Sequence, residues 1–205
     1  MTTPTLPGTV DWSGENPGMY LKERPDGPFV TLVSFFRVVL SPHGRGHALV
    51  LLEAPLYEGS LPEALNVCVT DNEPLARWLV QEYVVHFGAF RGAGVLETMD
   101  YRPLTGVAVS GDQRSAHVEW VKGDGVDATL AWEALGPPFM VQLPVEQSAT
   151  RRHRMFSVFV DAGRVTAKVN GRALRGQPVP RDFAGRRSST AFLAFSETWV
   201  RPEAA

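Results

Sequence analysis

The chain has 205 residues, of which 44% are hydrophobic and 20% charged, and its formal net charge is −2. These values are ordinary for a globular protein, and they argue against a disordered chain and against the strongly basic surface of a protein that coats nucleic acid. No apolar run reaches the roughly 18 residues that span a bilayer. We therefore expect a soluble protein with neither a nucleic-acid nor a membrane partner.

The first 28 residues are rich in Pro, Gly and Thr, and they have neither a basic start nor an apolar stretch. We expect an irregular N-terminal arm over 1–28 rather than a secretory signal, and a cytoplasmic location. No linker or repeat interrupts the rest, so 29–205 is expected to be a single mainly-β domain. The one cysteine, Cys68, lies in an apolar run, which indicates an inert buried thiol.

From Phe29 onward, short segments of β-type residues alternate with turns that contain Gly and Pro. Many short strands at regular spacing favour an antiparallel β-barrel or a two-sheet sandwich over a βαβ fold. The expected strands are 29–40, 47–53, 65–70, 95–101, 104–110, 115–122, 126–133, 139–143, 155–160, 165–169 and 190–200.

One segment, 71–87, breaks the strand pattern and predicts an amphipathic helix that caps a barrel or packs on the sheet. Asp71 or Asn72 can cap its first turn, Pro74 suits that turn, and Gly88 can end it. Its apolar face recurs at intervals of three and four residues, at Leu75, Trp78, Leu79, Tyr83, His86, Phe87 and Phe90. Glu73 and Arg77 are spaced to pair on the solvent side.

The clearest hairpin joins 115–122 to 126–133, and its register decides where His117 and Glu119 point. A three-residue loop, Gly123–Gly125, would place Lys122 opposite Val126 and would separate the polar face from the apolar face completely. A two-residue loop would instead place His117 and Glu119 beside Leu130 and Trp132, as in a pocket wall. We favour the first register, since segregation of polar from apolar residues is typical of a half-buried hairpin.

The last expected strand carries the most unusual polar residue. Glu197 falls on a face with Ala191, Leu193, Phe195 and Trp199, so its carboxyl group must be paired, protonated or facing a cavity. The ligand-binding candidates are Glu197, His117, Glu119, Glu133, Trp132, Trp199, Lys168 and His86. Two arginine groups, at 151–154 and 181–187, lie in loops beside strands, where they could bind an anionic ligand or could be solvated and paired with nearby aspartates.

Residues 35–40, 47–53 and 65–71, followed by a helix, are similar in order to acetoacetate decarboxylase-like proteins, which are antiparallel barrels. Those enzymes use a lysine soon after the corresponding helix, where this chain has Phe87-Gly-Ala-Phe-Arg-Gly92 and only an arginine. The likeness covers about a third of the chain and contains no specific motif, so the chain is not assigned to that family.

Nucleophile elbows, nucleotide-binding loops and zinc-type histidine spacings are all missing, and we expect no metal or other cofactor. Three hypotheses stay open: a small-molecule-binding barrel with an apolar and aromatic cavity, a metal-independent lyase, decarboxylase or isomerase that uses the same cavity, and a structural or interaction protein. Residues after Pro144 carry a net charge of +6 and the first 144 carry −8. We expect that this asymmetry favours a homo-oligomer.

Overall fold

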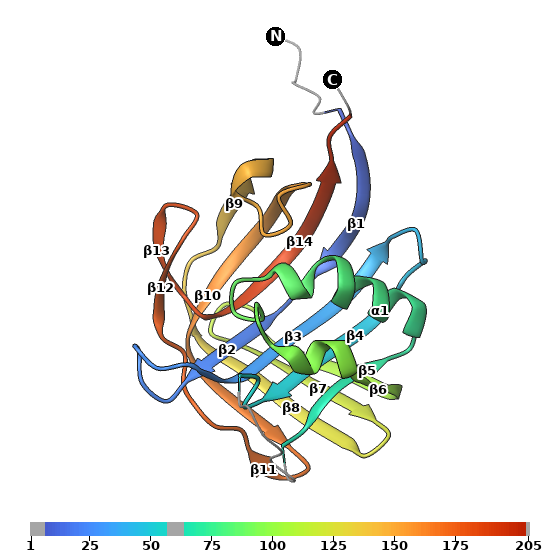
Figure 1. Cartoon of the computed structure of the whole chain (residues 1–205). Helices are drawn as coiled ribbons and strands as arrows, with labels where there is room; N and C mark the ends of the chain where they lie inside the picture. Colours follow the sequence, from blue (N-terminus) through green and yellow to red (C-terminus); the bar gives the residue numbers. More distant parts are fainter. Residues whose placement is uncertain (1–6, 57–63, 204–205) are drawn as a thin grey trace.

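The computed structural model of the chain describes residues 7–56 and 64–203. It is a mostly β protein in which nine strands close a barrel, in the order β14, β2, β3, β4, β5, β6, β7, β8, β10 and back to β14 (Figure 1). Neighbouring strands are antiparallel except β5 and β6, which are parallel and are joined by the crossover that contains the helix. A barrel with one short helix confirms the predicted fold class.

The elements lie along the chain in this order: β1 (Thr9–Glu15), β2 (Gly18–Lys22), β3 (Phe29–Leu40), β4 (Gly46–Glu53), β5 (Asn66–Thr70), α1 (Glu73–Glu82), β6 (Asp100–Gly111), β7 (Ala116–Gly123), β8 (Val126–Leu135), β9 (Phe139–Leu143), β10 (Arg154–Val169), β11 (Arg172–Ala173), β12 (Pro180–Phe183), β13 (Arg186–Ser189) and β14 (Ala191–Arg201). Three short 3₁₀ helices are η1 (Val84–His86), η2 (Gly94–Thr98) and η3 (Val145–Gln147).

The barrel wall separates two apolar cores. Along β3, Val33 and Phe35 belong to the cluster inside the barrel, with Trp132, whereas Leu32 and Phe36 belong to a second cluster outside it. That second cluster contains the apolar face of α1 and the segments that follow the helix, which Figure 1 shows lying across the outer face of the sheet. Burial on both faces explains why β3 reads as a nearly continuous apolar run.

The helix begins where the sequence predicts and ends earlier. The Asn72 side chain accepts a hydrogen bond from the Leu75 amide at 3.1 Å, and Arg77 pairs with Glu73 at 2.7 Å. The α-helix stops at Glu82 instead of continuing to residue 87. Tyr83 leaves the helix with φ −129°, and its ring packs edge-on against Trp199, so tertiary packing overrides the helical periodicity here.

The first 28 residues are not an irregular arm throughout, because β1 and β2 are strands of the sheet. Trp12 is fully buried, and β1 pairs with both β14 and β3. The glycines that suggested irregularity mark close approaches instead: a Cβ on Gly14 would stand 2.1 Å from the Arg37 carbonyl oxygen, and one on Gly18 would meet the Phe192 ring. Residues 94–98 form η2 where a strand was expected, and β10 runs unbroken through two expected strands.

The favoured register of the β7–β8 hairpin is wrong. Lys122 pairs with Asp127, so the loop has two residues, and His117 and Glu119 stand opposite Trp132 and Leu130. Their side chains enter the barrel, because the apolar residues of β8 are needed there to fill the interior. Trp120 takes the other face and is 37% exposed.

Two smaller points complete the fold. Cys68 is buried, and burial raises the pKa of its thiol to about 12, which agrees with the predicted inert thiol. Of the helices in the described part of the chain, none has the length and apolar character of a membrane-crossing segment.

Candidate functional site

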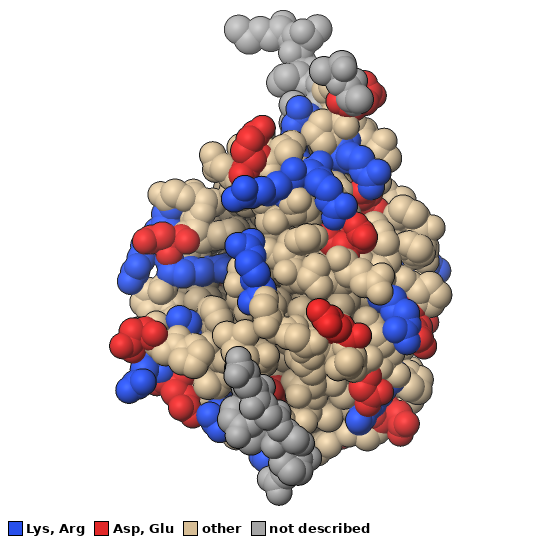
Figure 2. Space-filling view, in the orientation of Figure 1, with Lys and Arg blue, Asp and Glu red and all other residues tan. Residues whose placement is uncertain are grey.

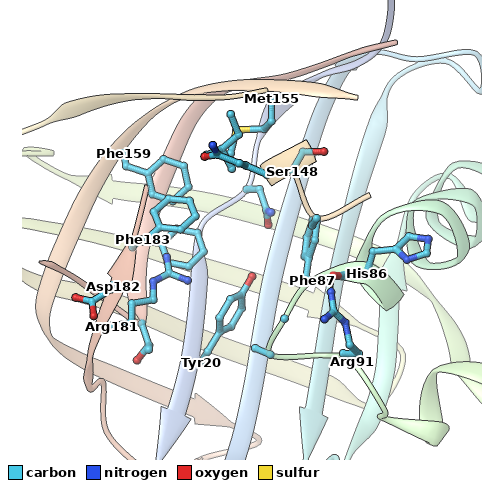
Figure 3. A pocket seen from close by; sticks show the side chains of 18 of the residues that line it. Tyr20, His86, Phe87, Arg91, Ser148, Met155, Phe159, Arg181, Asp182 and Phe183 are labelled. Atoms are coloured by element: carbon cyan, nitrogen blue, oxygen red, sulfur yellow. Dashed lines mark hydrogen bonds between the residues drawn. The ribbon is translucent and has the colours of Figure 1, made fainter. Parts of the chain in front are cut away.

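A pocket of about 510 Å³ lies on the outer face of the barrel wall. Its floor is formed by outward-facing residues of β2, β10 and β14, and it is covered by residues 86–91, by the loop between β9 and β10, and by the β12–β13 hairpin (Figure 3). This volume is in the range of small-molecule sites. The barrel interior, in contrast, is filled by the side chains of its own apolar cluster.

Aromatic rings make up much of the pocket wall. Phe192 lies in the floor, and its ring centroid is 5.3 Å from that of Tyr20 and 5.0 Å from that of Phe159. Phe183, on the β12–β13 hairpin, stands 5.0 Å from Phe159. Edge-to-face and tilted contacts of this kind hold large apolar surfaces in defined positions. The pocket therefore has a wall of aromatic rings that pack against one another.

Glu197 reaches the pocket through a bulge in β14. The ladder with β10 pairs Phe156 with Thr198 but Val158 with Phe195, so β14 has an extra residue between the two pairs. Ser196 occupies this position with φ +52°, in the left-handed region. The bulge reverses the alternation of the strand. Phe195 therefore packs with the interior cluster, while Glu197 lines the outer pocket. The sequence-based assignment of Glu197 to the face of Leu193 and Phe195 is wrong for this reason.

The carboxyl group of Glu197 is 3% exposed and bonded to other side chains. Oε1 accepts a hydrogen bond from Trp199 Nε1 at 2.7 Å, and the Asn16 side chain is a second partner. Burial raises the pKa of Glu197 to about 7, although both hydrogen bonds act in the opposite direction. Glu197 thus exists in both protonation states near neutral pH.

A chain of polar groups continues from Glu197 across the floor. Ser34 Oγ donates to Asn16 Oδ1 at 2.9 Å, and the Tyr20 hydroxyl stands 3.4 Å from Ser34 Oγ. Burial raises the pKa of Tyr20 to about 12, and this hydroxyl lies within electrostatic reach of both Glu197 and Arg181. Tyr20 therefore stays neutral and can donate or accept a hydrogen bond in the pocket.

Arg181 supplies a positive charge at the other side of Tyr20. Its guanidinium carbon lies 4.5 Å from the centroid of Phe183 and 4.7 Å from that of Phe192. Figure 3 shows it among the aromatic rings, while the neighbouring Asp182 points away. Burial lowers the pKa of Arg181, and the nearby Tyr20 and Asp161 oppose this effect. The guanidinium group nevertheless stays charged, because arginine is not deprotonated in proteins.

The structure places three of the predicted candidates at this pocket. Glu197, Trp199 and His86 line it, although the imidazole of His86 points away from its centre in Figure 3. Glu133 and Lys168 lie elsewhere: Glu133 pairs with Arg164 at 3.1 Å on the barrel surface, and Lys168 is exposed on β10. The cavity-facing position considered for Lys168 is thus not found.

His117, Glu119 and Trp132 form a different group, inside the barrel. His117 Nε2 bonds to Glu119 Oε1 at 2.6 Å, and Arg37 links Glu119 to Glu15. His117 packs between the rings of Trp132 and Phe195. These residues are brought together by the two-residue loop, but the barrel wall separates them from the outer pocket.

Sequence reasoning missed Tyr20 and Asn16 because both lie in the segment expected to be irregular. Arg181 belongs to the arginine group 181–187, where an anionic ligand was considered, but nothing in the sequence distinguished it from Arg186 and Arg187. Arg181 differs from them in lying two residues before Phe183 on a short strand. This spacing indicates a site residue only once the hairpin is known to fold over the pocket.

Positive charge also gathers near the cover. In Figure 2, Lys and Arg side chains cross the upper part of the face that carries α1, near the loop between β9 and β10, where Arg151 lines the pocket. Within residues 7–56 and 64–203, no group of three or more His, Cys, Asp or Glu side chains is arranged to hold a metal ion. No protein-family model matches the sequence, and comparisons with curated proteins and with solved structures likewise found no match.

Proposed function

We propose that the protein binds a small, largely apolar organic molecule in the pocket on the outer face of its barrel. The observation that carries this proposal is the pocket of about 510 Å³, whose aromatic wall surrounds a buried carboxyl group. An apolar pocket with a few convergent polar groups is typical of small-molecule sites. Glu197 and Tyr20 give such a ligand hydrogen-bonding partners in a fixed direction.

The test uses N-phenyl-1-naphthylamine, a neutral probe whose fluorescence rises in apolar surroundings. We expect it to bind the wild-type protein and to bind Phe183→Ala roughly tenfold more weakly, because an aromatic contact of about 1–2 kcal/mol is lost from the cover. Phe183 is half-buried on the hairpin and packs on the outer apolar cluster, so its removal leaves the core inside the barrel intact.

The matched control is Val109→Ala on β6, because Val109 is 57% exposed and does not line the pocket. This variant should bind the probe like the wild type. No fluorescence response from the wild-type protein, or an equal loss of binding in both variants, would show that this pocket is not the binding site.

The pKa of Glu197 also favours a second candidate, metal-independent acid–base catalysis in the same pocket. A carboxyl group with a pKa of about 7 can accept and donate a proton at neutral pH. If this is the function, a pocket ligand incubated in D₂O should gain deuterium at carbon, as followed by NMR, and Glu197→Gln should stop the exchange. A ligand that is bound by the wild type but recovered without deuterium supports binding alone.

A further inference from the structure

Two nitrogens of Arg181 are buried without a hydrogen-bond partner among the described residues. They are Nε and Nη2, which together form the side-on edge of the guanidinium group. This edge presents two parallel N–H donors, the arrangement that binds both oxygens of one carboxylate. A buried donor without a partner is costly, and an unpaired buried charge more so.

The nearest acidic residues do not satisfy this edge. Asp182 is 85% exposed on the other side of the strand and pairs with Arg187 at 3.5 Å. Asp161 accepts hydrogen bonds from Ser188 Oγ at 2.6 Å and from the Ser189 amide at 3.2 Å. Glu197 bonds to Trp199 and Asn16. Among residues 7–56 and 64–203, this guanidinium edge therefore has no hydrogen-bond partner beside the pocket.

The position of this edge is held by aromatic rings. The guanidinium carbon lies over the rings of both Phe183 and Phe192, so cation–π contacts hold the group in place without using its N–H donors. Phe192 is also part of the pocket floor. An anionic group bound at the edge would therefore lie at the boundary of the aromatic surface, with the rest of the ligand over that surface.

We propose that Arg181 is the anion-recognition residue of the pocket and that the ligand is an amphiphilic monoanion, with a carboxylate held side-on by Nε and Nη2 and an apolar body against the aromatic floor. This inference rests on the proposed binding function. The two donors of this edge match the two oxygens of one carboxylate, and Lys22, Arg91 and Arg151 also line the pocket. A phosphate monoester carries a charge of about −1.5 to −2 on three acceptor oxygens, more than the two donors of this edge can bond.

The experiment compares 1-naphthylacetate with 1-naphthylacetamide, two ligands of the same shape that differ in charge. Both are titrated as competitors of N-phenyl-1-naphthylamine. We expect the acid to displace the probe from the wild-type protein at a concentration about 10- to 100-fold lower than the amide, as a hydrogen bond to a charged group implies. Arg181→Met should abolish this difference while the neutral probe still binds.

Arg187→Met is the matched control, since Arg187 lies on the same hairpin, is 68% exposed and does not line the pocket. It should keep the preference for the acid. Thermal melts of the ligand-free proteins test whether Arg181 stabilises the fold instead of binding the ligand. Arg181→Met should melt no lower than the wild type, because it removes a buried charge whose Nε and Nη2 have no partner among the described residues. Equal displacement by acid and amide, or the same loss in both variants, would overturn the inference. Failure of the neutral probe to bind the wild type would instead contradict the proposed function.

Discussion

At the scale of single residues, Glu197 is a buried carboxyl group whose pKa is raised by burial. Its pKa is about 7 in the folded protein and about 4.5 in an unfolded chain, so the folded state binds the proton more tightly. The resulting stabilisation is complete below pH 4.5 and is lost as the pH rises through 7. Relative to Glu197→Gln, the wild-type free energy of unfolding should therefore fall by about 3 kcal/mol between pH 4.5 and 8.

Urea unfolding of both proteins at several pH values measures this difference. Other titrating groups contribute equally to both proteins and cancel. Glu23→Gln is the control for a glutamate-to-glutamine substitution outside the pocket, because Glu23 is 57% exposed and pairs with Arg175 at the surface. A difference between Glu197→Gln and wild type that stays constant with pH would mean that the carboxyl group is hydrated.

At the scale of the element, the bulge at Ser196 decides which face of β14 presents Glu197. Ser196 is exposed and has φ +52°, a conformation that glycine adopts freely and β-branched residues resist. Ser196→Gly should therefore melt at a higher temperature than the wild type, and Ser196→Val at a lower one. The free energy of unfolding should differ by roughly 1 kcal/mol between each variant and the wild type. Calorimetry checks the order. If valine is tolerated as well as glycine, the bulge does not persist in solution.

At the scale of the whole molecule, Asp11 joins three distant parts of the chain. Its Oδ2 accepts from His153 Nε2 at 2.7 Å and from Arg201 Nη2 at 2.6 Å, and His153 Nδ1 bonds to Thr150 Oγ1 at 2.8 Å. This links β1, the end of β14 and the loop that covers the pocket. Burial lowers the pKa of His153, and hydrogen bonds from His153 and Arg201 lower that of Asp11 despite burial.

Asp11→Asn should reduce the free energy of unfolding by about 1–3 kcal/mol, because the buried His153 loses a charged acceptor. It should also weaken probe binding, since the covering loop loses an anchor. Urea unfolding and probe titration measure the two effects. The control is Asp127→Asn, which removes an exposed pair with Lys122 and should cost well under 1 kcal/mol. Equal effects of the two substitutions would show that Asp11 does not hold the cover in place.

The local pattern of the sequence determined those features that depend on neighbouring residues. Alternation and composition predicted β3 and β9 with their observed bounds, and Asn72 and Pro74 predicted the start of α1. The apolar surroundings of Cys68 predicted its burial. In each case the residues that define the feature lie within a few positions of one another, so their physical preferences can be read without knowing the fold.

Tertiary structure decided how the residues of the site are brought together. Strand alternation separates two faces but does not say which one faces a cavity, and the extra residue at Ser196 reversed that assignment for Glu197. Tyr20 joined the pocket only because β2 pairs with β3 and β14, and Arg181 became distinctive only when its hairpin brought it against Phe192. Such contacts depend on pairing between segments that are far apart in the sequence, which no local pattern of residues encodes.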